Sequence, residues 1–160
     1  METINLIFLS LHNVLRWVVL LLGVVLVVRS ILGWLQKWDY QERDRKITSI
    51  FSGVYDLQIL IGIILFFTKG WGGVLMNAPA EVMETASLRF FAVEHWTLMI
   101  VAAVLIHIGS TQVKKATESI KKYRRATVWF TIALLLTLAS IPWPGMSAAR
   151  PLFRFFGLVF

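Results

Sequence analysis

Four long apolar segments constrain what this chain can fold into. They cover roughly residues 4–28, 47–67, 88–109 and 126–143. A helix needs about 20 mainly apolar residues to cross a hydrocarbon core about 30 Å thick, and each segment has that length. The sequence therefore predicts an all-α fold, an integral membrane four-helix bundle that forms a single domain over the whole chain.

The composition supports the same class. Hydrophobic residues make up 58% of the 160 residues, and the mean hydropathy of +0.72 is too high for a soluble domain of this size. The chain contains no cysteine. Disulfides, thiolate metal sites, thiol nucleophiles and covalent c-type haem attachment are therefore excluded, and any metal would be held by histidine, methionine or oxygen ligands.

Basic residues are concentrated in two loops of the predicted bundle. Residues 29–46 and 110–125 hold eleven lysines and arginines, whereas the opposite side holds four, Lys69, Arg89, Arg150 and Arg154. By the positive-inside rule, the basic loops face the cytoplasm and both termini lie on the periplasmic side. We therefore expect a multi-pass protein of the bacterial inner (cytoplasmic) membrane. Its net charge of +7 is explained by topology and lipid headgroups, with no nucleic acid as partner.

Two further segments are expected to lie along the outer membrane surface. The outer loop, residues 68–87, contains three glycines and then a helix-capable stretch that begins with Pro79. The tail after Pro144 is aromatic and too short to span the bilayer. Both are predicted to be short interfacial segments.

The third apolar segment carries polar residues that lipid cannot satisfy. Residues 87–110 include Glu94, His95 and His107. An ionisable group inside the membrane costs about 3 kcal/mol or more unless something pairs with it. Another helix or a bound cofactor must therefore supply partners.

His12 and His95 are predicted to lie at one depth in the membrane. Each is about seven residues from the outer end of its segment, or roughly 10 Å below the outer boundary. A bis-histidine haem needs this arrangement, because its iron takes one imidazole on each face of the porphyrin. Gly23 and Ala102 lie on the same helical stripes and would leave room for a flat macrocycle. The two histidines could equally be polar groups that bond across helices.

Arg16 is the residue most costly to bury. It lies near mid-membrane, and Asp56 in the second segment comes out at almost the same depth, so a buried Arg16–Asp56 ion pair is the simplest interpretation. The alternative is that Arg16 binds a haem propionate. Because propionates usually point to the aqueous side, Arg89 and Lys69 are better candidates for that role.

Glu94 and His107 keep several interpretations open. Glu94 points about 100° away from its neighbour His95 around the helix, so it would hold Arg16, orient His12 through a hydrogen bond, or face a quinone or proton path. His107 lies about 18 Å deeper than His95, where no other segment offers a histidine. We interpret it as an interfacial histidine near the cytoplasmic end.

Other chemistries are less compatible with the sequence. No hydrolytic or group-transfer site is visible, because no nucleophile with its base and no glycine-rich phosphate loop occurs. Three scattered histidines do not form a zinc site. A redox role as a component of a larger complex is the one enzymatic role left open.

Several short motifs follow one another along the chain: LHNVLRW at 11–17, DLQILIG at 56–62, LRFFAVEH at 88–95 with Met99, KK at 114–115, and SIPWP at 140–144. Together they resemble a family of short four-helix bacterial membrane proteins labelled cytochrome b-like. The resemblance covers most of the chain in the same order. It implies a b-type haem, with His12 and His95 as its axial ligands.

We therefore expect a membrane electron-transfer protein that binds one haem b between the first and third helices near the outer face. A quinol or respiratory partner fits this role, and a quinone is a further candidate cofactor. The residues predicted to bind the cofactor are His12, His95, Arg89, Arg16, Gly23 and Ala102. The residues predicted to form a buried ion pair are Arg16, Asp56 and Glu94. The alternative is a haem-free accessory or assembly subunit of a larger membrane complex, whose buried polar residues only fix helix register.

Overall fold

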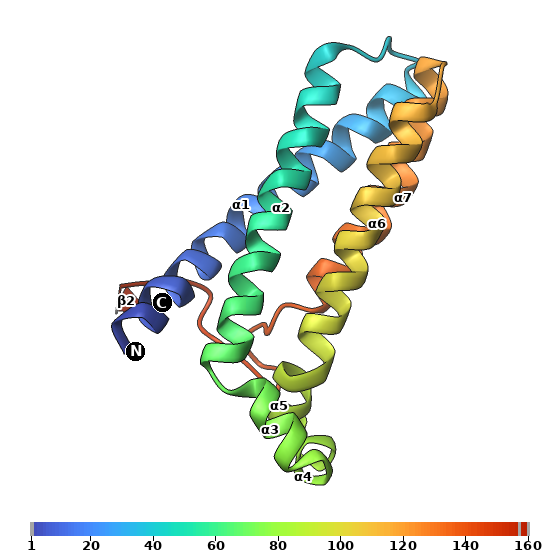
Figure 1. Ribbon diagram of the computed structural model, residues 1–160. Coiled ribbons are helices and arrows are strands. Elements are labelled where there is room, and N and C mark those ends of the chain that lie inside the picture. Colours follow the sequence, from blue (N-terminus) through green and yellow to red (C-terminus); the bar gives the residue numbers. More distant parts are fainter. Residues whose placement is uncertain (1, 157, 160) are drawn as a thin grey trace.

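The computed structural model describes residues 2–156 and 158–159, and this part of the chain is mostly helical (Figure 1). The elements are α1 (Glu2–Leu35), α2 (Glu42–Thr68), α3 (Trp71–Asn77), α4 (Pro79–Glu84), α5 (Ala86–Arg89), a π-helical turn η1 (Phe90–Glu94), α6 (His95–Lys115), α7 (Ser119–Ala139), β1 (Arg154–Phe155) and β2 (Leu158–Val159).

Three helical stretches are long and apolar enough to cross a membrane. They are Thr3–Leu35, Glu42–Thr68 and Ala86–Lys115, the last formed by α5, η1 and α6 in one continuous run. The predicted helical membrane class is confirmed as far as length and composition define a span. All three helices extend beyond the predicted apolar segments, because a helix continues past the membrane boundary onto charged residues.

The fourth predicted segment is corrected by the structure. Helix α7 ends at Ala139, so residues 140–143 leave the helix that was expected to continue to 143. Pro142 has no backbone N–H and restricts the residue before it, which ends the helix. The apolar part of α7, residues 126–139, is therefore only about 21 Å long.

The four long helices pack around an aromatic core. Helix α1 contacts α2 and α7, and α6 contacts α7 and α2. Phe51, Tyr55 and Phe130 are almost fully buried between them. The Tyr55 hydroxyl satisfies its polar atom by a 2.9 Å hydrogen bond with Thr137. Close packing of this kind needs small residues where backbones approach, and a Cβ on Gly109 of α6 would lie 2.6 Å from Trp129 of α7.

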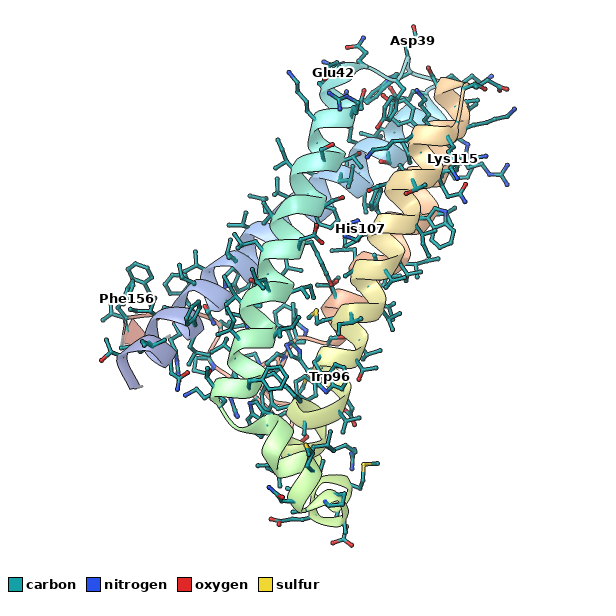
Figure 2. The ribbon with its side chains drawn as sticks, in the orientation of Figure 1. Asp39, Glu42, Trp96, His107, Lys115 and Phe156 are labelled. Carbon is teal, nitrogen blue, oxygen red and sulfur yellow. The ribbon has the colours of Figure 1, made fainter. Side chains whose placement is uncertain are left out.

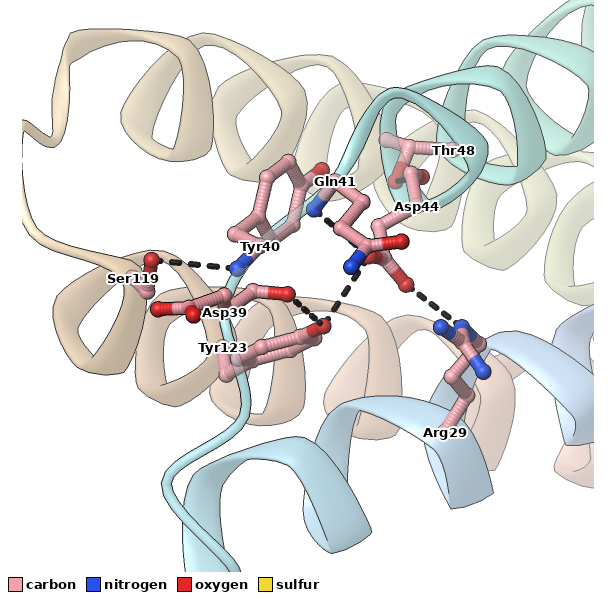
Figure 3. Close-up of polar contacts among 8 residues, drawn as sticks. All are labelled: Arg29, Asp39, Tyr40, Gln41, Asp44, Thr48, Ser119 and Tyr123. Carbon is pink, nitrogen blue, oxygen red and sulfur yellow. Dashed lines mark hydrogen bonds and ion pairs between the residues drawn. The ribbon is translucent and has the colours of Figure 1, made fainter.

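A polar cluster lies at the end of the molecule where short loops join α1 to α2 and α6 to α7 (Figure 3). Asp44 is buried at the start of α2 and binds the Arg29 guanidinium at 2.5 Å. The Tyr123 hydroxyl donates to Asp44 at 2.9 Å, and the Gln41 backbone N–H donates to it at 2.8 Å. One carboxylate thus joins α1, α2 and α7, which fixes how these helices meet.

Both termini lie at the opposite end from those short loops (Figure 1). There α3, α4 and α5 form the connection between α2 and α6, and α4 begins at Pro79 as predicted. The tail after α7 returns to α1, where β1 contacts the helix. This path brings residues 150–154 to the site described next.

Candidate cofactor site

His12 on α1 and His95 on α6 face each other near the end of the molecule that holds the termini. Their ring centroids are 6.3 Å apart and the ring planes differ by 76°. The structure thus brings together the two residues for which the sequence predicted one depth. Both rings line the same cavity, so a single ligand could contact both.

The backbone just before His95 departs from α-helical geometry. The π-helical turn η1 spans Phe90–Glu94 and His95 follows it directly. A π-turn inserts an extra residue into the helix, which rotates the residues after it, and such turns are frequent at functional sites. The Phe90 ring stacks on the His95 imidazole at 5.7 Å with an interplanar angle of 29°. Backbone and ring stacking together orient this imidazole.

A hydrogen bond completes the orientation of His95. Its Nδ1 lies 2.7 Å from the backbone carbonyl oxygen of Ser140, just after α7. A carbonyl can only accept, so the proton resides on Nδ1 and the lone pair is on Nε2. A second hydrogen bond of this kind typically supports a metal-binding histidine. His95 is therefore prepared to donate a lone pair through Nε2.

His12 is held by different contacts. The Gln58 side-chain amide donates to the His12 backbone carbonyl at 2.9 Å, which links α2 to this turn of α1. Gly62 leaves room for the ring, because a Cβ there would lie 3.3 Å from His12 Cε1. The buried His12 Nδ1 has no hydrogen-bond partner among the described residues. A buried polar atom of this kind is expected to have a partner, which a bound ligand could supply.

The cavity between the helices has a volume of about 380 Å³. Cofactor pockets typically measure about 300 to 1,000 Å³ and are mainly apolar with a few polar groups. Aromatic and aliphatic side chains form most of its wall, with Met99 at one side. The aromatic side chains that line it are those of Phe66, Trp71, Phe91, Trp96 and the two histidines.

Four cationic side chains surround the cavity. They are Arg16, Lys69, Arg150 and Arg154, and no aspartate or glutamate of the described residues joins them in the lining. The Arg150 guanidinium also lies 4.4 Å from the Phe91 ring centroid. Burial, and then the nearby charge of Arg154, lowers the pKa of Arg150. Crowded cations of this kind favour an anionic ligand.

The tail is tied to α1 beside the cavity. The Arg154 backbone N–H donates to the Asn13 side chain at 3.0 Å, and the Phe156 backbone N–H donates to Ser10 Oγ at 3.1 Å. The Leu152 carbonyl accepts from Arg16 and, at 3.0 Å, from the Trp17 indole. These bonds fix the position of the two tail arginines.

Three predicted cofactor residues lie elsewhere. Arg89 binds Glu94 at 2.8 Å and the Met83 carbonyl at 2.7 Å, and it does not line the cavity. A Cβ on Gly23 would lie 3.0 Å from Leu134 of α7, and Ala102 is fully buried in the apolar core. Gly23 and Ala102 therefore serve helix packing, because the stripe to which they belong turns towards the core below the histidines.

The predicted Arg16–Asp56 pair is wrong, and so is the assignment of Glu94 to Arg16. Asp56 binds His107 at 2.8 Å, and Glu94 binds Arg89. Arg16 donates to the Leu152 carbonyl instead. Depth along the helices was a poor guide here, because α1 and α2 turn these two side chains to different faces. His107 therefore has a partner on α2, which was not predicted from the sequence.

Sequence reasoning missed several cavity residues. Asn13 and Gly62 belong to the motifs at 11–17 and 56–62, and that membership was the available signal. Arg150 and Arg154 gave no signal, because only the folded tail brings them to the cavity.

Among the described residues, no three or more His, Asp or Glu side chains gather around one point as possible metal ligands. Comparisons with models of known protein families, with characterised proteins and with solved structures found no match.

Proposed function

We propose that the protein is a b-type haem-binding membrane electron-transfer protein, with one haem held between α1 and α6 by His12 and His95. The observation that carries this proposal is the separation of the two imidazoles. A metal such as zinc binds an imidazole nitrogen at about 2.0 to 2.1 Å, and the ring centre lies about 1 Å further. Two imidazoles that held one metal ion between them would therefore be centred about 6 Å apart. The observed separation is 6.3 Å.

The composition of the cavity supports the same ligand. A haem iron needs only two protein ligands, because the porphyrin supplies the other four nitrogens. The macrocycle is flat and apolar, and it carries two propionates. Aromatic walls suit the ring, and the cations of Arg16, Lys69, Arg150 and Arg154 suit the carboxylates. Arg16 and the tail arginines thus replace Arg89 in the role that the sequence suggested for it.

The residues of this chain would position the group and set its properties. A bound haem supplies one-electron redox chemistry. His95 holds its lone pair towards the cavity through the bond to Ser140, and His12 approaches from the opposite helix. The cations stabilise the carboxylates and the buried walls exclude water. In this arrangement the protein binds, orients and electrostatically tunes the redox centre.

The membrane arrangement completes the proposal. We place α7 as a fourth crossing, which makes the fold a four-helix bundle with both termini on the periplasmic side of a bacterial inner membrane. The eleven-to-four distribution of basic residues supports this orientation. The haem then lies near the outer face, where a quinol or respiratory partner would exchange electrons with it. The motif order resembles the cytochrome b-like family and agrees with this assignment.

An absorption spectrum tests the proposal. The chain is expressed with an adequate haem supply and purified in mild detergent, and oxidised and dithionite-reduced spectra are recorded. We expect a Soret band and, after reduction, distinct α and β bands. A bare protein spectrum from folded, membrane-inserted protein would contradict the proposal and would favour a haem-free accessory or assembly subunit.

A further inference from the structure

The pair formed by Asp56 and His107 lies where lipid is expected. His107 Nε2 and Asp56 Oδ1 are 2.8 Å apart, and the two side chains are 57% and 50% exposed. Figure 2 shows His107 on the side of α6 that faces α2. Asp56 lies near the middle of the predicted apolar segment 47–67, and His107 lies beside it at the same level. We therefore place the pair inside the hydrocarbon core.

Lipid leaves this pair incompletely satisfied. Each group has one further polar atom, Asp56 Oδ2 and His107 Nδ1, and neither has a hydrogen-bond partner among the described residues. Polar and ionisable groups at this depth are costly, and they almost always face other protein or a water-filled cavity. Exposed apolar residues elsewhere on the helices need no such cover, because lipid solvates them. The Asp56–His107 face is thus distinguished from the rest of the surface.

The surroundings of the pair permit a close approach by another helix. Gly53 lies one turn before Asp56 on the exposed side of α2, and a Cβ there would meet nothing within 4 Å. Ser49 is exposed one turn further along the same side. Small residues four apart let helix backbones approach closely in membranes. Below the pair, Ser52 and Ser110 are already bonded to each other at 3.1 Å.

We propose that this face binds a second copy of the chain, related by a two-fold axis parallel to the membrane normal. Asp56 and His107 lie side by side at one depth. Rotation by 180° about such an axis places Asp56 of each copy opposite His107 of the other. The remaining carboxylate oxygen then meets the remaining ring nitrogen, so the patch is self-complementary. Both copies keep the same orientation in the membrane, as insertion requires.

Disulfide cross-linking in native membranes tests the interface. The chain has no cysteine, so a single introduced cysteine reports one position. Gly53→Cys lies one turn from Asp56 on the face that the second copy would cover, so its cross-linking reports that face. Leu135→Cys is the control, because Leu135 is 60% exposed on α7 away from this face. We expect a disulfide-linked dimer from Gly53→Cys on oxidation, and monomer from Leu135→Cys.

Second-site changes show whether the polar pair is responsible. Adding Asp56→Ala to Gly53→Cys should abolish most of the cross-link, whereas the exchange Asp56→His with His107→Asp keeps the patch self-complementary and should retain it. Helicity by circular dichroism confirms that each variant is folded, and the cross-link is read without reference to haem. Failure of the haem proposal therefore leaves this test intact.

Two outcomes would overturn the inference. One is cross-linking of Gly53→Cys no stronger than that of Leu135→Cys in folded protein. The other is monomeric protein whose tryptophan fluorescence is quenched by a short-chain quinone, with the quenching lost in His107→Ala. That second result would assign the pair to a lipid-soluble quinone and not to a second copy.

Discussion

The centroids of the His12 and His95 imidazole rings lie 6.3 Å apart, and the rings are nearly perpendicular. The two residues belong to α1 and α6, and they also receive contacts from α2 and from the chain just after α7. Neither ring reaches this position through its own helix alone. Gln58 of α2 bonds the turn that carries His12, and Ser140, after α7, bonds the His95 ring. The site therefore depends on the assembly of all four long helices.

The two histidines should both be needed for haem retention. His12→Ala and His95→Ala each remove one of the two histidines proposed to hold the haem, so each variant should lose most of its haem while it remains membrane-inserted and helical. The ratio of Soret to protein absorbance measures this loss. His107→Ala is the control, because His107 binds Asp56 outside the cavity. Loss of haem in His107→Ala with retention in His12→Ala would place the haem near His107, and the assignment to His12 and His95 would be wrong.

A larger side chain at Gly62 should reduce haem binding. A Cβ added at Gly62 would lie 3.3 Å from His12 Cε1, so the branched side chain of Gly62→Val would displace the imidazole. We expect reduced haem content with unchanged helicity. Gly73→Val is the matched control, since a Cβ on this helical glycine meets nothing within 4 Å. Equal haem content in the two variants would show that the space beside His12 is not used.

The Arg29–Asp44 pair should stabilise the loop end of the molecule. Removing one member leaves a buried charge without its partner, which costs about 3 to 5 kcal/mol when the site is fully buried. Asp44 is only 4% exposed, so Arg29→Ala should lower the free energy of unfolding strongly. Tyr123→Phe removes one hydrogen bond to the same carboxylate and should cost about 1 to 2 kcal/mol. Denaturation in mixed detergent micelles, followed by circular dichroism, measures both.

A milder effect is expected when both charges are replaced. Arg29→Met with Asp44→Leu leaves no stranded charge, so this double variant should be more stable than Arg29→Ala alone. If the double variant were as damaged as the two single changes added together, the two residues would not act as a mutual pair.

The orientation of the chain should follow its basic loops. Cysteine probes are placed at Ala80, in α4 of the connection between α2 and α6, and at Glu118, in the loop before α7. In spheroplasts, an impermeant thiol reagent should label Ala80→Cys and should reach Glu118→Cys only after lysis. The reverse pattern would invert the topology. The candidate cofactor site would then face the cytoplasm, with the geometry of its residues unchanged.

The sequence predicted the parts of this protein that depend on local properties. Helix class and three spanning stretches follow from the length and apolarity of segments, and these properties do not depend on what each helix contacts. The approach of His12 to His95 was also accessible, because depth in a membrane can be counted along each helix from its end. That count works for any residue whose helix runs from one surface to the other.

The rotation of each helix and the path of the tail were decided only by tertiary structure. Arg16 and Asp56 are at the same predicted depth, but their side chains extend from faces of α1 and α2 that do not meet. Asp56 binds His107 instead. Residues 140–156 carry little periodic signal, but their bonds to Ser10, Asn13 and Arg16 bring two arginines over the cavity. Hydrophobicity determined which segments enter the membrane, because it acts residue by residue. Which polar side chains meet depends on packing between helices far apart in the sequence, and the chain acquires that information only when it folds.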